Sequence, residues 1–446
     1  MILGYDVRGL YKKEVDESLA YEIGLTLSKL GKGDKITVGY DSRTSSTSLH
    51  NSLVNGLVDG GCNVITIGMV PNPVCYFYTF HKKMDCGVYI TASHLPAEYN
   101  GFKFIRKDGT SFTEELTEIK RILDQGDLRK SERSGKHEID VLAEREYVEY
   151  LYPKFRVLGK PVVVVDCMYG ASSNLAPRLL EKVGCKVVAL RAKALGDFNK
   201  IRPEPLPDNL SLLQEEVVKN KALFGVAYDG DADRCVFVDD QGRVIDGSAM
   251  IAIFSKYLLM RRKGRIIATI DCLSVLEDVI SEFGGELIWS KVGRTNVEQE
   301  LVKNKALFGG EQSSHFYFHD FYPFSDGMLA TLYLVEMLTQ SAERLSRLVD
   351  SLNLPFYEKE RVDCGTHERK EKVLEVLKEE LEESGLEMIK IDGFKFKYGE
   401  CWVLIRGSNT EPAIRVSVES FDKSKLKEVK MKFLKRINSI LKESSS

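Results

Sequence analysis

The fold of this chain of 446 residues is decided by a run of β-branched residues that ends in a carboxylate, VVVVD (162–166). A helical pattern across residues 175–183 follows it, then Gly184, then a second apolar run at 187–190. A glycine directly after a helix suits the left-handed residue that ends it, and short apolar runs are typical of parallel strands covered on both faces. The stretch 162–190 therefore predicts a βαβ unit.

The same pattern occurs twice more along the chain. The copies are ITVGYD (36–41) with a helix reaching Gly60-Gly61 and a strand at 64–67, and IIATID (266–271) with a helix at 275–283, Gly284-Gly285 and a strand at 287–289. Three such units predict three similar α/β domains in tandem. One large doubly wound sheet is the alternative, but its units would lie far closer together in the sequence.

The pattern changes beyond about Leu354. A charged helical stretch at 368–384 is followed by strand-like alternation at 395–405 and at 413–418, which predicts a smaller α+β domain. The polar run 126–138 reads as a surface loop near the end of the first domain. We therefore expect four domains, with the boundaries 1–143, 144–243, 244–350 and 351–446.

Composition narrows the class of protein. Lys and Arg number 63 against 66 Asp and Glu, a net charge of −3, whereas a general nucleic-acid binder shows a basic excess. The nine cysteines form no CxxC pair, as is typical of buried thiols in a reducing cytosol. The apolar stretch 249–260 is too short to span a bilayer, and residues 1–9 show no signal peptide. We expect a cytoplasmic protein with no membrane segment and no nucleic-acid partner.

A serine after a predicted strand is the first candidate for chemistry. The loop TASHLP (91–96) follows the apolar segment 87–90, so Ser93 should lie at the carboxyl edge of a strand, where open α/β sheets bind ligands. A serine carries a phosphoryl group or attacks as a nucleophile only when something activates it. His94 and Lys103 are nearby candidates for proton transfer or charge stabilisation. Taken alone, a Ser-His pair in a loop is more often structural.

A second loop, DGDADR (229–234), follows the apolar segment 223–227 and carries three carboxylates at alternate positions. Three carboxylates share a small volume only with a cation between them, and oxygen ligands suit Mg²⁺ or Ca²⁺. An EF-hand is excluded, because its sixth and twelfth positions need Gly and Glu but hold Arg234 and Asp240 here. A solvated acidic turn is the plain alternative, and a metal site is favoured.

Two further loops are rich in groups that bind sugars and phosphates. GGEQSSH (309–315) offers Glu, Ser and His side chains to a polyhydroxy ligand. RGSNTEP (406–412) combines an Arg with small hydroxyls and an Asn on a flexible backbone, which suits a phosphate dianion. Either loop alone is equally compatible with a surface turn.

Taken together and in this order, the four loops resemble those of the α-D-phosphohexomutase family, most closely its phosphomannomutase/phosphoglucomutase branch. The resemblance covers nearly the whole chain and includes GYDVRG (4–9), RPEPLP (202–207), FYF (316–318) and DGM (326–328). It implies four domains around a central cleft: three of one α/β fold with mixed sheets, and a fourth related to the TATA-binding-protein fold. This agrees with the repeat read from the residues.

The resemblance also implies a role for each candidate residue. Ser93 is the expected phosphoserine, and one Mg²⁺ is expected on Ser93, Asp229, Asp231 and Asp233. Charge neutralisation is expected from Arg8 and Arg234, and help with proton transfer from His94 and Lys103. The residues expected to bind the substrate are Glu311, Ser313, His315 and Arg294 at the sugar, and Arg406, Ser408, Asn409 and Thr410 at the phosphate that does not react.

The implied reaction is an intramolecular phosphoryl transfer that interconverts hexose 6-phosphate and hexose 1-phosphate. A hexose 1,6-bisphosphate is the expected intermediate and activator, and a hexose phosphate is the expected partner, bound by a monomer or homodimer. Phosphoserine carries nearly two negative charges, so three neighbouring aspartates are tolerable only beside a divalent cation and an Arg. Phosphoryl transfer is mainly positioning and charge neutralisation, which these groups offer.

Three positions depart from the family pattern: Tyr40 stands where many members have Arg, Arg294 where His is frequent, and Ser314 where Gly is frequent. The Asn409 and Asp6 motifs favour mannose or glucose phosphate as the substrate, whereas Gln312 favours phosphoglucosamine mutase, which is the alternative. Outside the family, the aspartates also suit a metal-dependent sugar-phosphate phosphatase, for which an Asp nucleophile is expected. A non-catalytic sugar-phosphate sensor is the remaining alternative.

Overall fold

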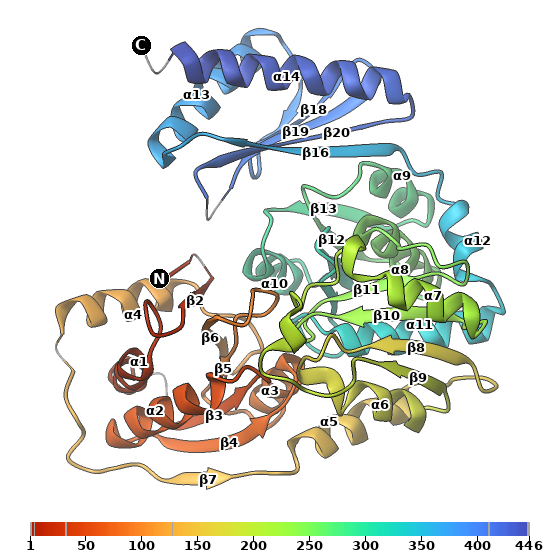
Figure 1. Ribbon diagram of the computed structural model, residues 1–446. Helices are drawn as coiled ribbons and strands as arrows, with labels where there is room; N and C mark the ends of the chain where they lie inside the picture. The colour runs from red at the N-terminus through yellow and green to blue at the C-terminus, as the bar shows by residue number, and fades with distance from the viewer. Residues whose placement is uncertain (1, 4, 32–33, 127, 409–410, 444–446) are drawn as a thin grey trace.

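The computed structural model describes residues 2–3, 5–31, 34–126, 128–408 and 411–443, and these form four sheets, one in each predicted domain (Figure 1). The first three sheets are mixed and the fourth is antiparallel, as the sequence predicts. Within the described residues, no helix is both long enough and apolar enough to cross a membrane. The exact domain boundaries stay a prediction.

Domain I is built on a seven-stranded sheet in the order β1-β2-β6-β5-β3-β4-β7. Its strands are β1 (Ile2–Leu3), β2 (Asp6–Leu10), β3 (Lys35–Tyr40), β4 (Asn63–Met69), β5 (Cys86–Ile90), β6 (Tyr99–Arg106) and β7 (His137–Ile139). Its helices are α1 (Glu17–Lys29), α2 (Ser46–Asp59), α3 (Asn72–His81) and α4 (Glu114–Gln125). The strand β7 lies at the end of the predicted surface loop, and its three exposed residues gave no alternating pattern by which to predict it.

Domains II and III repeat one four-stranded arrangement. Domain II has α5 (Ala143–Leu151), β8 (Val162–Asp166), α6 (Ala176–Lys182), β9 (Lys186–Leu190), α7 (Ser211–Lys219), β10 (Phe224–Tyr228) and β11 (Cys235–Val238). Domain III has α8 (Gly247–Arg261), β12 (Arg265–Thr269), α9 (Val275–Glu282), β13 (Glu286–Ser290), α10 (Arg294–Lys303), β14 (Phe308–Gly310), β15 (Phe316–Phe318), α11 (Gly327–Ser341) and α12 (Leu345–Asp350).

The internal repeat is visible in the pairing of the strands. In domain II, β8 pairs in parallel with β9 and β10, and β11 closes the sheet antiparallel to β10. The strands β13, β12, β14 and β15 of domain III, and β4, β3, β5 and β6 of domain I, pair in the same way. The predicted glycines Gly61, Gly184 and Gly284 follow the equivalent helices with φ of +96°, +105° and +69°, where a residue without a side chain is favoured.

One hydrophobic core runs through domains II and III and reaches α3 of domain I. Tyr147 of α5 is buried in it and donates a hydrogen bond to Asp326 at 2.7 Å. Domain IV has a separate core. The first three domains are thus packed against one another, whereas domain IV sits on them as a distinct layer (Figure 1).

Domain IV is an antiparallel sheet in the order β16-β20-β19-β18-β17. Its elements are β16 (Phe356–Asp363), α13 (His367–Glu383), β17 (Met388–Ile389), β18 (Phe394–Tyr398), β19 (Cys401–Gly407), β20 (Ala413–Ser420) and α14 (Lys423–Glu443). Helices α13 and α14 cover one face, above the sheet in Figure 1. Because side chains alternate along a strand, Val416 and Val418 enter the core under these helices while Arg415 and Glu419 point toward the other face.

Candidate active site

The predicted site loops occupy equivalent places in the three repeats. Ser93 lies between β5 and β6, the three aspartates lie between β10 and β11, and the Glu311–His315 loop lies between β14 and β15. In each domain the loop leaves the carboxyl end of a parallel strand and returns in a strand antiparallel to it. The repeated topology therefore presents three different loops to a common region.

Ser93 is buried in contact with the aspartate cluster. Its Oγ donates a hydrogen bond to Asp229 Oδ2 at 2.8 Å, across the interface of domains I and II. Its backbone N–H donates to Thr91 Oγ1 at 2.7 Å, and its φ of +52° is left-handed, which is unfavourable for a residue with a side chain. The predicted proximity of the serine and the carboxylates is thus present, although they are far apart in the sequence.

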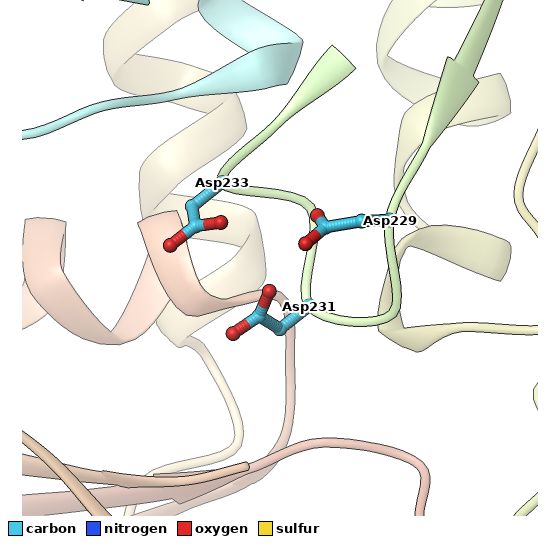
Figure 2. Close-up of side chains that lie close together, drawn as sticks. All are labelled: Asp229, Asp231 and Asp233. Atoms are coloured by element: carbon cyan, nitrogen blue, oxygen red, sulfur yellow. The ribbon is translucent and has the colours of Figure 1, made fainter. Parts of the chain in front are cut away.

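Asp229, Asp231 and Asp233 lie around one point (Figure 2). Each offers a carboxylate oxygen, these oxygens lie within 4.8 Å of one another, and all three residues are buried. Lys103 Nζ donates to Asp231 Oδ2 at 2.7 Å and to Asp233 Oδ2 at 2.6 Å. Asp231 Oδ1 is buried without a hydrogen-bond partner in the described structure.

The surroundings shift the pKa values of two of these carboxylates in opposite directions. Burial, together with Asp231 and Asp233, raises the pKa of Asp229 well above its ordinary value. Burial also acts to raise the pKa of Asp233, but Lys103 and His315 outweigh it and hold that pKa well below its ordinary value. Asp233 Oδ1, like Asp231 Oδ1, is buried without a hydrogen-bond partner in the described structure. Buried carboxylates that repel one another, two of them with such an oxygen, fit a hard divalent cation such as Mg²⁺.

His94 lies beside Ser93 as a neutral imidazole. Its Nδ1 is 3.4 Å from Ser93 Oγ and its Nε2 is 3.9 Å from Glu204 Oε1. Burial lowers the pKa of His94 well below 6.5, and the positive charges of Arg234 and Arg8 lower it further. At neutral pH this histidine therefore has a free lone pair with which to accept a proton.

Arg8 and Arg294 share one carboxylate. Arg8 NH2 donates to Asp6 Oδ2 at 2.6 Å, and Arg294 NH2 donates to Asp6 Oδ1 at 2.5 Å. Burial acts to raise the pKa of Asp6, but Arg294 and Arg8 outweigh it and the pKa is lowered. Arg294 NH1 also lies 3.8 Å from Asp233 Oδ2. Arg294 therefore ties β2 of domain I to the aspartate loop of domain II, residues 229–234, called the metal loop below.

The predicted sugar loop is internally bonded. Glu311 Oε1 accepts a hydrogen bond from Tyr317 OH at 2.5 Å and lies 3.2 Å from His315 Nδ1. Ser313 Oγ lies 3.0 Å from the same ring nitrogen. Arg234 Nε donates to His315 Nε2 at 3.2 Å, which joins this loop to the metal loop. Glu311, Ser313 and His315 therefore form one hydrogen-bonded group.

These loops surround a cavity of about 490 Å³. The predicted residues that line it are Arg8, Ser93, His94, Lys103, Asp233, Arg234, Arg294, Glu311, Ser313 and His315. Asp229 and Asp231 lie behind it, bonded to Ser93 and Lys103 respectively. The cavity is also lined by residues that were not among the predicted site residues, namely Tyr5, Asp6, Arg202, Glu204, Val292, Gly293 and Arg415.

Domain IV reaches the cavity through Arg415 of β20, and the predicted Arg406 and Ser408 do not line it. Arg406 NH1 donates to Asp392 Oδ2 at 3.0 Å, and the same oxygen accepts from the backbone N–H of Val292, on the cavity wall, at 3.1 Å. The predicted phosphate-binding residues Asn409 and Thr410 lie outside the described residues.

Comparison with known proteins decides the family. The four phosphoglucomutase/phosphomannomutase domain models match in order: alpha/beta/alpha domains I, II and III at residues 3–130, 145–242 and 246–354, and the C-terminal domain at 360–436. Phosphoglucosamine mutase of Methanococcus vannielii is 33% identical over 433 residues, covering 94% of this chain and 95% of the relative. The chain belongs to the α-D-phosphohexomutase family.

Other relatives of this phosphohexomutase agree. Phosphoglucosamine mutase of Methanocaldococcus jannaschii is 33% identical and is covered over 98% of each chain. The crystal structure of a phosphoglucomutase/phosphomannomutase family protein from Burkholderia thailandensis matches with a TM-score of 0.90 at 28% identity, over 98% of this chain and 97% of that one. The family and the four-domain fold predicted from the sequence are confirmed.

The structure shows the local surroundings of Gln312 and of two departures from the family pattern, Ser314 and Tyr40, in this phosphohexomutase. Ser314 has a φ of +65°, a conformation that favours the glycine frequent in relatives. Gln312 is turned away from the cavity, because its Nε2 donates to Asp246 Oδ2 at 2.5 Å and its Oε1 accepts from Ser248 Oγ. Tyr40 packs its ring against His50 with centroids 5.0 Å apart and does not line the cavity.

Some residues that line the cavity of this phosphohexomutase could be predicted only weakly from the sequence. Arg202 and Glu204 belong to the RPEPLP segment, which the family resemblance singled out without a role. Arg415 faces Arg406 across the β19–β20 pair, so two arginines adjoin where one was predicted. A charged residue alternating with core residues indicates an open face of a sheet, but not which cavity that face meets.

Proposed function

We propose that this phosphohexomutase interconverts glucosamine 6-phosphate and glucosamine 1-phosphate through a phosphorylated Ser93. The observation that carries the proposal is the 2.8 Å contact of Ser93 Oγ with Asp229 Oδ2, which joins a candidate phosphoryl carrier to a candidate metal site. The adjoining cavity of about 490 Å³ has the volume of a small-molecule pocket. Its walls carry positive groups, as a sugar phosphate requires.

The groups around Ser93 suit phosphoryl transfer, which depends on positioning and charge neutralisation. Arg8 and Arg234 line the cavity beside Ser93 and would bind the phosphoryl oxygens. Asp229, Asp231 and Asp233 would hold Mg²⁺, which when bound acts as a Lewis acid on phosphoryl oxygens. Lys103, the present partner of two of these carboxylates, would supply further positive charge.

In the proposed cycle, the phosphoryl group leaves Ser93 Oγ for the free hydroxyl of the bound hexose phosphate and gives a hexose 1,6-bisphosphate. The sugar hydroxyl loses its proton as its P–O bond forms, and Ser93 Oγ gains a proton as its own P–O bond breaks. His94, held neutral beside Ser93, is suited to exchange these protons. The bisphosphate then turns around, and its other phosphoryl group returns to Ser93.

The far wall of the cavity would hold the rest of the substrate. The sugar hydroxyls would form hydrogen bonds with Glu311, Ser313 and His315, because these three side chains line the cavity as one hydrogen-bonded group. The phosphate that does not react would meet Arg415 together with the predicted residues Arg406, Ser408, Asn409 and Thr410. Arg294, bonded to Asp6, would act on the substrate mainly by fixing the wall near Arg8.

Glucosamine phosphate is preferred over the mannose or glucose phosphate expected from the sequence. The relatives from Methanococcus vannielii and Methanocaldococcus jannaschii, each 33% identical, are both phosphoglucosamine mutases and match nearly the whole chain. Gln312, the one residue that favoured this substrate in the sequence, is bonded to Asp246 and Ser248, so its influence would be indirect, through the backbone of the sugar loop.

The covalent step is tested by Ser93→Ala. We expect kcat to fall by more than about a thousandfold, because the phosphoryl carrier is lost, and we expect intact mass to show one phosphoryl group on the wild type and none on the variant. The control is Ser281→Ala, at an exposed position of α9, which should change neither quantity. Full activity of Ser93→Ala would reject the phosphoserine and point to an aspartate nucleophile.

The sugar preference is tested by assays on the 6-phosphates of glucosamine, glucose and mannose. We expect kcat/KM for glucosamine 6-phosphate to exceed the other values by roughly tenfold or more, the range that one substituent usually contributes. A preference for mannose or glucose phosphate would contradict the proposed substrate and leave the reaction class intact. Turnover of none of the three would contradict the proposed reaction.

A further inference from the structure

Arg43 is buried directly behind the serine loop, residues 91–99, and all five of its N–H groups are hydrogen-bonded within domain I. Its NH2 donates to the carbonyls of Ser93 at 2.8 Å and Leu95 at 2.7 Å. Its NH1 donates to the carbonyls of Pro96 at 2.5 Å and Tyr99 at 2.9 Å. Its Nε donates to Asp41 Oδ2 at 3.0 Å. Four of the five acceptors are backbone atoms of the serine loop.

The residue at position 43 must be an arginine for this arrangement to form. A guanidinium offers five donors in a planar fork, whereas a lysine offers three around a single nitrogen and would leave carbonyls without partners. The buried positive charge is balanced by Asp41, whose side chain is likewise inaccessible to solvent. Nothing in the phosphoryl-transfer scheme above uses Arg43, which does not line the cavity.

Two chains of hydrogen bonds from this pair converge on Ser93. Arg43 binds the Ser93 carbonyl directly. Asp41 accepts from Thr91 Oγ1 at 2.7 Å, and Thr91 Oγ1 in turn accepts from the Ser93 N–H at 2.7 Å. The left-handed φ of Ser93, +52°, is unfavourable for a residue with a side chain and persists only where the surroundings impose it. The Arg43–Asp41 ion pair therefore holds the carbonyl of Ser93 directly and its N–H through Thr91.

Domain II holds Arg43 from the opposite side. The guanidinium carbon lies 5.0 Å from the ring centroid of Phe198, which is fully buried. Phe198, Asn199 and Lys200 all have positive φ, so this segment is itself held in an unfavourable conformation. The contact spans the interface of domains I and II, which is also spanned by the contact of Ser93 with Asp229.

We propose that Arg43 is a positioning residue for phosphoryl transfer, which holds the serine loop so that Ser93 Oγ meets the carboxylate cluster, and that Phe198 fixes the guanidinium from domain II. Arg43 acts through the backbone of the serine loop, and its side chain does not line the cavity. The kinetic part of this inference rests on the proposed function, whereas the ordering of the loop does not.

The kinetic test compares Arg43→Lys with the wild type. We expect kcat to fall about a hundredfold, as for a displacement of about 1 Å at a reacting group, with KM for the hexose phosphate changed less than about threefold. The matched control is Arg243→Lys, because Arg243 also binds an aspartate and a backbone carbonyl but lies outside the cavity lining. Its kcat should equal that of the wild type. An Arg43→Lys variant with wild-type kcat would overturn the inference.

Amide hydrogen exchange tests the loop without substrate. In Arg43→Lys, peptides covering residues 91–99 should exchange at least about tenfold faster, while peptides of β12 stay unchanged. Unchanged exchange in the loop would overturn the inference whatever the activity. If the wild type turns over no hexose phosphate, the proposed function fails, and the exchange result still decides the role of Arg43 in ordering the loop.

A milder variant covers the case in which Arg43→Lys does not fold. Phe198→Leu removes only the stacked ring, and we expect a fall in kcat of roughly tenfold with KM unchanged. When both variants fold, the double variant should lose no more activity than Arg43→Lys alone, because the two side chains act on one loop. Independent, multiplicative losses would reject the coupling to domain II.

Discussion

Glu298 is a single residue whose titration should be visible near neutral pH. It lies on α10, is fully buried and accepts two hydrogen bonds from Ser111 of domain I, from N–H at 2.7 Å and from Oγ at 3.1 Å. Burial raises its pKa from 4.5 to about 7, and Arg294 offsets part of this effect. The folded protein therefore binds a proton at this carboxyl group between pH 4.5 and 7 that the unfolded chain does not.

The sign of the effect on stability follows from this raised pKa. The protonated carboxyl stabilises the fold fully below pH 4.5, and this contribution is lost as pH rises through about 7. A shift of this size corresponds to about 3 kcal/mol. We expect Glu298→Gln, which resembles the protonated form, to match the wild type at pH 4.5 and to be more stable at pH 8.

Thermal unfolding from pH 4.5 to 8 measures this difference. Glu300→Gln is the control on the same helix, because Glu300 is paired with Lys303 near the surface and should leave the pH profile unchanged. Parallel profiles for Glu298→Gln and the wild type would show that folding does not raise the pKa of Glu298 and would contradict the prediction.

At the scale of elements, each repeat uses the aspartate near the end of its first strand differently. The pairs are Asp41 with Arg43 at 3.0 Å, Asp166 with Arg191 at 2.8 Å, and Asp271 with Lys359 at 4.0 Å. The first pair holds the serine loop. In the second, Arg191 also donates to the carbonyl of Asn209, whose side chain donates to the carbonyl of Glu204 on the cavity wall. The third pair joins domain III to domain IV.

Removal of the second pair should affect both the fold and the site. In Asp166→Asn the partly buried Arg191 loses its carboxylate, and we expect a loss of about 3 kcal/mol in the free energy of unfolding. The loop that carries Glu204 would then shift, so kcat/KM should also fall, by roughly tenfold. Unfolding and steady-state kinetics measure the two effects. Asp350→Asn, at an exposed pair, should cost less than about 0.5 kcal/mol; a similar small loss for Asp166→Asn would contradict the prediction.

The sequence predicts the helices, strands and site loops better than it predicts the side-chain contacts between distant segments. Apolar runs, terminal glycines and the loops after strands come from local chemistry, so the three βαβ units, Ser93 and the aspartate trio were accessible from the chain alone. The partner of Asp271 was not, because Lys359 belongs to another domain and no local rule links them. Arg415 was missed for the same reason. Arg43 was visible three residues after β3, but its four carbonyl acceptors depend on the path of a loop distant in the sequence.

At the scale of the whole molecule, a buried lysine joins domain IV to domain III. Lys395 of β18 donates to the carbonyl of Cys272 at 2.8 Å, and its Nζ lies 4.1 Å from the ring centroid of Trp289 and 6.0 Å from that of Trp402. Glu419 of β20 lies 3.8 Å from it and accepts hydrogen bonds from Ser274 at the start of α9. These two tryptophans are the only ones in the chain, Trp289 in domain III and Trp402 in domain IV.

Tryptophan fluorescence should therefore report directly on the docking of domain IV. Lys395→Met removes the cation between the rings and leaves Glu419 buried without its positive partner, which costs about 3 kcal/mol at this interface. Because Arg415 reaches the cavity only while domain IV is docked, we expect KM for the hexose phosphate to rise about tenfold, with kcat changed less. We also expect the tryptophan emission to shift to longer wavelength.

The control is Lys397→Met, an exposed change on the same strand, which should leave KM and the tryptophan emission unchanged. A rise in KM without a change in emission would mean that the lysine acts on the substrate by a route other than the position of domain IV.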